Sequence, residues 1–275
     1  SVTHDLVEGW RKAGVNRMSL GVQSFDAQVL TWMGRLHGPD GAVRAVKAIK
    51  EAGVHNLSVD LIFGLPSRLN RCWRTDLYKV LELDVPHINL YGLSIESDTP
   101  LGRSVRDGSE VPVNEGQYRD EYLAAVELLG NAGYQHYEVS SFSQPGFSSR
   151  HNSVYWDGRP YLGLGNAAHS YSDSYRRWNV RDWLSYSALA TETGVTWEKG
   201  EHLDVASRSL ERLWLGLRTV FGLPIRDLDD PQRLIIESWA REGWSVLEDE
   251  RVRLTAEGWL VLDRLTLELD NARAG

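Results

Sequence analysis

The sequence predicts an α/β fold in which helices alternate with parallel strands. Along its 275 residues one pattern occurs four times: a helix end, usually closed by glycine, leads directly into an apolar run. These runs start at Asn16, His55, Pro86 and Gln135. Repeats of roughly 30 to 50 residues are typical of βα units. Strands that alternate with helices in this way are expected to pair in parallel.

The predicted strand at residues 56–63 is the centre of this arrangement. Its sequence, NLSVDLIF, is mostly apolar, which predicts burial on both faces, and Gly64-Leu65-Pro66 then turns the chain. One carboxylate, Asp60, lies among the apolar residues. Burying an acid is costly unless it is paired or used. Asp60 is therefore either satisfied by backbone donors or contacts a ligand at the carboxyl end of the strand.

The helices between the strands are predicted from apolar stripes. One stripe begins at Trp73 and continues at i+4, i+7 and i+8, and another begins at Tyr118, behind Asn114 as a plausible N-cap. A helix at residues 1–14 has no strand before it, so the chain begins inside a repeat. Three parallel strands do not close a barrel, which needs about eight. We therefore expect either an open sheet or a fragment.

The second half of the chain has a different character. From residue 140 to 186 the periodicity fails, which predicts a long irregular segment of the kind that often carries function. Helices at 205–220 and 231–241, a hairpin within 244–254 and a helix from Thr255 suggest a winged-helix-like module. Acidic side chains outnumber arginines there and lysine is absent, so DNA binding is disfavoured. A structural or interaction role is expected.

Composition excludes several classes of protein. A net charge of −8 argues against nucleic acid or anionic lipid as the main partner. The single cysteine, Cys72, excludes a disulfide framework and a multi-cysteine metal site built from this chain. No apolar run approaches the length of a membrane span and no signal peptide opens the sequence. A cytoplasmic protein is expected.

Polar residues near two predicted strand ends suggest a ligand site. Gln23 ends the first strand, Arg35 follows after a short helix, and Asp60 lies on the second strand. These three side chains could converge on one polar ligand. They offer an amide, a guanidinium that can form two parallel hydrogen bonds to a carboxylate, and an acid that accepts hydrogen bonds from hydroxyls or an ammonium. For Arg35 a solvated helix end is the competing interpretation.

Histidines in the irregular segment offer a second kind of chemistry. In Arg150-His-Asn-Ser-Val-Tyr-Trp156, His151 could ligate a metal or haem iron, and the two aromatic residues could stack on a flat ring. An ordinary loop histidine beside packed aromatics is the alternative, and the same choice applies to His169. The run Gly163-Leu-Gly165-Asn-Ala-Ala168 resembles a dinucleotide fingerprint, but no strand precedes it and no helix follows it.

A series of motifs through the whole chain resembles one family. SLGVQSF, Gly34-Arg35, VDLIFGLP, INLYGLSIESDTPLG, YEVSSFSQPGFSSRHNSVYW, YLGLGNAAHSY and RRWNV occur in the order seen in HemW, the haem-chaperone branch of the radical SAM coproporphyrinogen III oxidase family. The resemblance implies a partial TIM barrel of six βα units, of which this chain holds the last three, followed by a small C-terminal domain. It divides the chain into residues 1–140 (barrel), 141–200 (irregular connection with the HNxxYW motif) and 201–275 (C-terminal domain).

The resemblance also implies cofactors and partners. By matched position Gln23, Arg35 and Asp60 resemble contacts to S-adenosylmethionine (SAM). The family's proposed haem motif corresponds to His151, Asn152, Tyr155 and Trp156, with His151 as the candidate iron ligand. The expected partners are haem and haem-acceptor proteins, with membrane contact only through acceptors.

Two departures from the family pattern limit what the chain can do. The CxxxCxxC loop that holds the family's [4Fe–4S] cluster is absent, and Cys72 cannot replace three clustered thiolates. The family's GLPGQT turn is replaced by Gly64-Leu-Pro-Ser-Arg-Leu69, which puts its backbone contacts in doubt. The sequence is thus expected to be an N-terminally truncated product or a fragment. By itself it is not expected to catalyse a radical reaction.

Three functional hypotheses follow from the sequence. The first is a haem chaperone that binds haem, SAM and a [4Fe–4S] cluster when complete. The second is an oxygen-independent coproporphyrinogen III oxidase, which the HNxxYW segment disfavours. The third is a non-catalytic haem-binding module that depends on His151 and needs no cluster.

Overall fold

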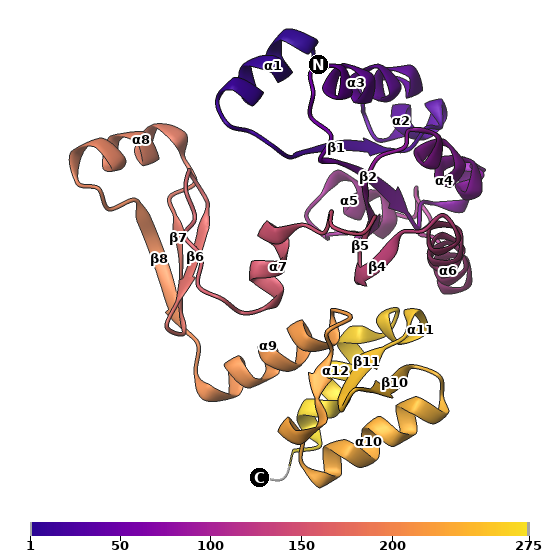
Figure 1. The fold of residues 1–275 in the computed structure, drawn as a ribbon, viewed down its shortest axis with the longest axis vertical. Coiled ribbons are helices and arrows are strands. Elements are labelled where there is room, and N and C mark those ends of the chain that lie inside the picture. The colour runs from indigo at the N-terminus through magenta and orange to yellow at the C-terminus, as the bar shows by residue number, and fades with distance from the viewer. Residues whose placement is uncertain (1, 274–275) are drawn as a thin grey trace. The chain divides into compact units, whose positions relative to one another are not determined.

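The structure, a computed structural model, describes residues 2–273. The chain forms two compact units, residues 1–148 and 149–275. The first unit is drawn in indigo to magenta in Figure 1, and the second continues to yellow. The three-part division expected from the sequence stays a prediction. No helix within residues 2–273 is long and apolar enough to cross a membrane.

A five-stranded sheet organises the first unit, with strand order β1-β2-β3-β5-β4. Its strands are β1 Met18–Gln23, β2 Leu57–Phe63, β3 His87–Gly92, β4 Gln135–Glu138 and β5 Ser141–Ser143. The helices are α1 His4–Lys12, α2 Ala27–Trp32, α3 Pro39–Glu51, α4 Trp73–Glu82, α5 Pro100–Arg106 and α6 Glu115–Asn131, with a 3₁₀ turn η1 Ser67–Leu69. Strands β1, β2 and β3 pair in parallel, as the sequence predicts.

The fourth apolar run does not add another parallel unit. After β4 the chain reverses at Val139-Ser140 and returns as β5, which pairs antiparallel with both β4 and β3. The hairpin places β5 between β3 and β4. Antiparallel strands can be joined by a two-residue turn, whereas another parallel strand would need a crossover of a dozen or more residues.

Helix ends follow the pattern expected from the sequence. Gly14, Gly53 and Gly133 all have positive φ at the position after a helix, where a left-handed residue ends it. In the repeat that lacks glycine, Asp84 takes this conformation with φ 47°. Asn114 is the N-cap of α6, and its side chain accepts a hydrogen bond from the Gln117 backbone at 2.8 Å.

The aromatic stripes pack in the core of the first unit. Phe63 at the end of β2 lies 6.3 Å from the Trp73 ring on α4 and 4.7 and 5.7 Å from Tyr118 and Tyr122 on α6, measured between ring centroids. Together these rings attach α4 and α6 to one face of the sheet. The opposite face carries the polar side chains described below.

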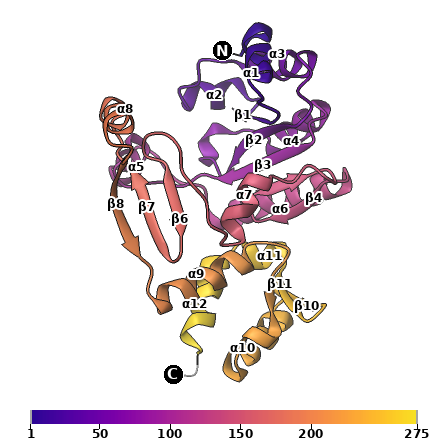
Figure 2. The ribbon, with the colours of Figure 1, turned by 60° about the vertical axis from the view of Figure 1, so that its left-hand side comes forward.

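The second unit contains two small antiparallel sheets (Figure 2). The first part comprises α7 Arg150–Trp156, β6 His169–Ser172, β7 Tyr175–Asn179, α8 Trp183–Glu192 and β8 Trp197–His202, with strand order β6-β7-β8. The second part comprises α9 Val205–Leu217, β9 Leu223–Pro224, η2 Ile225–Asp227, α10 Asp230–Arg241, β10 Ser245–Glu248, β11 Arg251–Leu254, α11 Ala256–Trp259 and α12 Leu262–Asn271. The predicted order of helix, helix, hairpin and helix is present in this second part.

The expectation of an irregular segment at residues 141–200 was wrong. It contains helices and most of a three-stranded sheet, and the HNxxYW motif lies on α7. The strands were missed because they lack an apolar face; every residue of β8 is exposed. Cross-strand aromatic pairs stabilise them instead, as where His169 stacks on Trp178 at 5.6 Å.

Candidate functional site

Asp60 belongs to a polar row that crosses the sheet. Its Oδ1 accepts hydrogen bonds from Ser19 Oγ on β1 at 3.0 Å and from Asn89 Nδ2 on β3 at 2.7 Å. Asn89 Oδ1 in turn accepts from Ser141 Oγ on β5 at 2.8 Å. Side-chain donors, rather than the backbone alone, therefore hold this half-buried carboxylate. They leave acceptor capacity on Oδ2, which has one contact, to Ser19 at 3.3 Å.

A second polar row crosses the same strands two residues earlier, at Ser58 and His87. His87 is buried between Ser58 Oγ, 2.8 Å from Nδ1, and the Tyr137 hydroxyl, 2.7 Å from Nε2. Burial first and the charge of Arg17 second lower the pKa of His87 to about 3, so the imidazole is neutral at pH 7. The parallel register aligns Ser58 with His87 and Asp60 with Asn89, so both rows share one face of the sheet.

The side-chain amide of Gln23 lies on this polar face. It is the last residue of β1, has φ 70° and lies at a register shift. A Cβ on Gly21 would lie 2.6 Å from Gln23 Nε2, so glycine leaves the room that the amide occupies. Gly21 pairs with Asp60 in the register of β1 and β2. The amide and the carboxylate thus lie on neighbouring strands. Gln23 Oε1 is buried and has no hydrogen-bond partner within residues 2–273.

Arg35 lies further along the same edge of the sheet. It follows α2 and is exposed, and its guanidinium makes no hydrogen bond or ion pair within the described part of the chain. It lines a cavity of about 630 Å³ together with Ile62, the residue two positions beyond Asp60 on β2. The structure therefore places Gln23 and Asp60 on neighbouring strands and Arg35 beyond them, without a direct contact among the three side chains.

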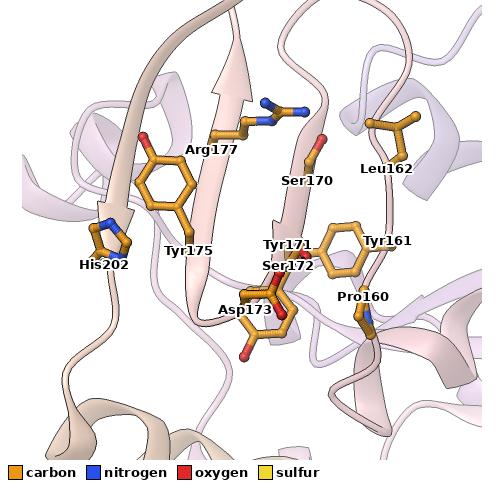
Figure 3. Close-up of a pocket in the computed structure, with 10 residues that line it drawn as sticks. All are labelled: Pro160, Tyr161, Leu162, Ser170, Tyr171, Ser172, Asp173, Tyr175, Arg177 and His202. Atoms are coloured by element: carbon orange, nitrogen blue, oxygen red, sulfur yellow. Dashed lines mark hydrogen bonds between the residues drawn. The ribbon is translucent and has the colours of Figure 1, made fainter.

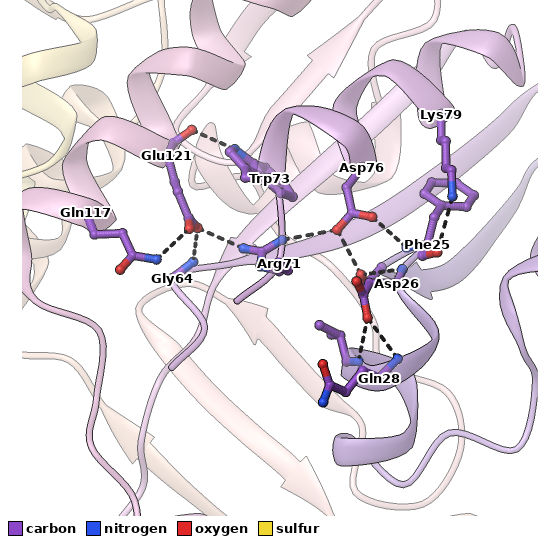
Figure 4. Close-up of polar contacts among 12 residues, drawn as sticks. Phe25, Asp26, Gln28, Gly64, Arg71, Trp73, Asp76, Lys79, Gln117 and Glu121 are labelled. Carbon is purple, nitrogen blue, oxygen red and sulfur yellow. Dashed lines mark hydrogen bonds and ion pairs between the residues drawn. The ribbon is translucent and has the colours of Figure 1, made fainter. Parts of the chain in front are cut away.

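Sequence reasoning missed the buried ion cluster that holds these strand ends (Figure 4). Arg71, only 3% exposed, pairs with Asp76 on α4 at 3.1 Å and with Glu121 on α6 at 2.8 Å. Asp76 accepts from the Phe25 backbone at 2.7 Å, just after β1. Glu121 accepts from the Gly64 backbone at 2.8 Å, just after β2. One signal was available: two acids directly precede core residues in otherwise apolar helix stripes.

The turn after β2, where the sequence departs from the family pattern, has partners of its own. Arg68 forms a two-pronged pair with Glu110, at 2.7 and 2.5 Å. Ser67 Oγ donates to Gln117 Oε1 at 2.6 Å. The ion pair lowers the pKa of Glu110, which keeps the carboxylate charged. The substituted residues thus fasten this turn to α6 and to the segment between α5 and α6.

The HNxxYW motif lies on the seven-residue helix α7, which Ser149 caps. Four residues apart on α7, His151 Nε2 and the Tyr155 hydroxyl are hydrogen-bonded at 2.9 Å. The Tyr155 ring meets Tyr161 edge-on, with centroids 4.7 Å apart. Trp156 is covered on one face by the Arg218 guanidinium, 4.1 Å from the ring centroid. The motif therefore divides into an accessible pair and a packed tryptophan.

The remaining candidates are placed as follows. Asn152 is half-buried on α7, and His169 is exposed on β6. Residues 163–168 lie between a bridge at Tyr161 and β6 without the strand-turn-helix context of a dinucleotide site. Within residues 2–273 no three His, Cys, Asp or Glu side chains gather as a metal site would require. Cys72 is exposed at the start of α4.

Comparisons with known proteins show which family the chain resembles. Residues 1–77 match the Radical SAM superfamily. The "Heme chaperone HemW" of Lactococcus lactis is 32% identical over 267 residues, covering 94% of this chain and 70% of the relative. The HemW protein of Escherichia coli is 38% identical over 171 residues, covering 62% of this chain and 44% of the relative.

A solved structure shows the same fold. Coproporphyrinogen III oxidase (HemN) from Escherichia coli, described as a radical SAM enzyme, matches 99% of this chain and 68% of its own with a TM-score of 0.76. At 20% identity this likeness concerns the fold alone. The sequence relatives extend over most of the chain at 30% identity or more. The chain belongs to the HemW family of haem chaperones within the radical SAM superfamily.

Proposed function

We propose that this chain binds haem at α7 and hands it to acceptor proteins; its relatives are named haem chaperones. The observation that carries the proposal is the accessible pair of His151 and Tyr155. A neutral imidazole on the surface of a helix can ligate haem iron. His151 is exposed, and its Nδ1 has no partner within residues 2–273. The Tyr155 hydroxyl holds the other ring nitrogen and so orients the ring.

Gln23, Arg35 and Asp60 are the proposed SAM contacts. SAM offers an ammonium, ribose hydroxyls and a carboxylate. Asp60, steadied by Ser19 and Asn89, can accept from the donors, and so can the unpartnered Gln23 Oε1. The free Arg35 guanidinium suits the carboxylate. These donors and acceptors fit the ligand. Gln23 lies at the carboxyl end of the parallel strand β1, which supports the assignment, whereas Asp60 lies midway along β2.

The [4Fe–4S] cluster of the superfamily does not fit the residues of this chain. Cluster iron takes cysteine thiolates, and Cys72 is the single cysteine in the sequence. The proposal therefore assigns no cluster ligand among these residues. In the superfamily the cluster and SAM together supply radical chemistry; this chain's contribution is to bind and orient SAM. We further infer that the first unit corresponds to the last three βα units of a six-unit partial barrel.

Haem titration tests the proposal directly. Haem is added to the full chain and the Soret band is followed for the wild type, His151→Ala and His55→Ala. His55 is exposed in the first unit and serves as the matched control. We expect His151→Ala to shift the Soret band and weaken binding about tenfold or more, since it removes the iron ligand, and His55→Ala to behave as wild type. Equal spectra for His151→Ala and wild type would remove His151 from the site.

A further inference from the structure

Two neighbouring arginines on β7 point to opposite faces of the β6-β7-β8 sheet and differ in their partners. Arg176 pairs with Glu201 at 3.3 Å and with Glu211 at 2.5 Å. Arg177 points to the opposite face, because successive side chains alternate along a strand. Its half-buried guanidinium makes no hydrogen bond or ion pair within residues 2–273. An arginine held without an anion is suited to bind a carboxylate or phosphate from a ligand.

Arg177 faces a cavity of about 690 Å³ (Figure 3). The strand register places Ser170 opposite Arg177 on one neighbouring strand and His202 opposite Tyr175 on the other. The Tyr175 and His202 rings lie 4.6 Å apart. Tyr161 lies on the chain segment that borders the cavity beyond β6. The Tyr175 and His202 rings thus lie on the same face of the sheet as one unpaired cation, whereas the Tyr161 side chain is hydrogen-bonded to Arg176 on the other face.

A glycine makes room for the central ring of this cavity. Gly200 on β8 pairs with Arg177, and a Cβ there would collide with the Tyr175 hydroxyl and lie 2.5 Å from its Cζ. The phenol therefore lies across the backbone of β8, beside the arginine. Any larger residue at position 200 would move the ring. The cavity keeps its shape because this position has no side chain.

The chain segment that borders the cavity contacts one of the candidate haem residues. Tyr155 is hydrogen-bonded to His151 and packs edge-on against Tyr161, which lines the cavity. The cavity itself offers one unpaired guanidinium, Arg177, beside the Tyr175 and His202 rings. A tetrapyrrole has the complementary chemistry, since it is a flat apolar ring with carboxylates along one edge.

We propose that this cavity binds the propionate edge of haem, with Arg177 paired to a propionate and Tyr175 and His202 packed against the macrocycle. The inference rests on the proposed haem-binding function and adds the groups that orient the cargo. Arg177 recognises the carboxylate, and the rings exclude water from the bound face. The cavity volume lies within the range of small-molecule sites, about 300 to 1,000 Å³.

The test compares two porphyrins and matched variants of the full chain. Haem and haem dimethyl ester, in which the propionates are uncharged, are titrated into wild type, Arg177→Gln and Lys199→Gln. Lys199 pairs with Trp178 on the same sheet, so its side chain lies on the opposite face. We expect wild type to bind haem about tenfold more tightly than the ester, and Arg177→Gln to lose this preference. Lys199→Gln should retain it.

A second variant probes the shape of the cavity without changing charge. Gly200→Ala should weaken haem and ester alike, because it displaces Tyr175. Equal affinities of the wild type for haem and ester would overturn the inference without any variant, and so would a preference that survives in Arg177→Gln. Either result would leave haem binding at His151 standing. A wild-type chain that binds neither porphyrin would overturn the inference and the proposed function together.

Discussion

The Arg71 guanidinium lies 2.8 Å from the Glu121 carboxylate, and Arg71 is only 3% exposed. Glu121 also holds the Gly64 backbone, and Asp76 extends the cluster to the Phe25 backbone. The cluster therefore fixes the chain where β1 and β2 end, next to the residues proposed to contact SAM. Burial raises the pKa of Asp76, whereas its hydrogen bonds and Arg71 lower it, so the acid depends on these partners for its charge.

Arg71→Met should therefore be strongly destabilising. It leaves two buried carboxylates without their cation, and we expect the free energy of unfolding to fall by about 3–5 kcal/mol. Urea denaturation measures the change. Arg74→Met is the matched control, because its pair with Glu127 is long, at 3.6 Å, and solvent-exposed, so its loss should cost less than about 1 kcal/mol. Similar losses for the two variants would show that the cluster contributes little.

The buried histidine in the sheet predicts acid sensitivity. His87 has a folded-state pKa of about 3, below the usual histidine value of 6.5. Between about pH 3 and pH 6.5 the unfolded chain therefore binds the proton more readily than the folded chain does. This contribution to stability is complete above about pH 6.5 and is lost as the pH falls towards 3, by up to about 1.4 kcal/mol per pH unit. In urea titrations His87→Gln should show a flatter dependence on pH across this window than His55→Gln. Parallel curves would contradict the prediction.

Gly92 at the end of β3 should resist substitution. A Cβ there would collide with the Tyr118 hydroxyl and lie 2.7 Å from Cζ, while the ring itself packs on Phe63. We expect Gly92→Ala to cost about 1–3 kcal/mol in thermal or urea unfolding. In a Tyr118→Ala background the same change should cost much less. Gly130→Ala on α6, where open space surrounds the new methyl, should instead stabilise by about 0.5–1 kcal/mol. A cost for Gly92→Ala that persists without the tyrosine ring would rule out this clash as its cause.

The packing of Trp156 under Arg218 predicts energetic coupling between α7 and α9. A double-mutant cycle with Trp156→Leu and Arg218→Met should give a coupling energy of about 0.5–2 kcal/mol. The measurement is the free energy of unfolding of the four proteins of the cycle. A coupling near zero would mean that the cation–ring contact does not stabilise α7, and that Trp156 is available to pack on a ligand.

Asp60 should control SAM binding. Asp60→Asn removes the carboxylate charge while nearly preserving shape, and equilibrium dialysis with labelled SAM should show affinity reduced about tenfold or more, because a charge-assisted contact is lost. Asp40→Asn, exposed at the start of α3, should bind as wild type. Equal binding by all three proteins would separate Asp60 from the SAM site and leave its contacts with Ser19 and Asn89 as a structural feature.

Much of the fold was predictable because local patterns encode it. The parallel strands and their helices follow from apolar runs and from glycines with positive φ at helix ends. The C-terminal helices and hairpin were placed to within a few residues, α9 ending at Leu217 rather than at residue 220. The sheet at β6, β7 and β8 was missed because hydrophobic periodicity reveals a strand only where one face is apolar. These strands mix polar and aromatic residues and have no aliphatic face.

The candidate site was predictable only in part. Gln23 and Asp60 were expected to converge on a ligand; the register of β1 with β2 places Gly21 opposite Asp60 and Gln23 opposite Leu61, and the convergence stays a prediction. Neither the polar partners of Asp60 nor the free guanidinium of Arg177 could be inferred from spacing. Both depend on which strands become neighbours and in what register.

The sequence by itself determined the parallel arrangement of β1, β2 and β3, the helix ends that glycine closes and the family, because these depend on local residue patterns and on motifs in series. Only the tertiary structure decided the rest: β5 inserted between β3 and β4, the ion cluster at Arg71, and the aromatic cavity at Arg177. The physical reason is distance along the chain. Arg71 and Glu121 are 50 residues apart in sequence, and their contact exists only because the folded sheet brings α4 and α6 onto the same face.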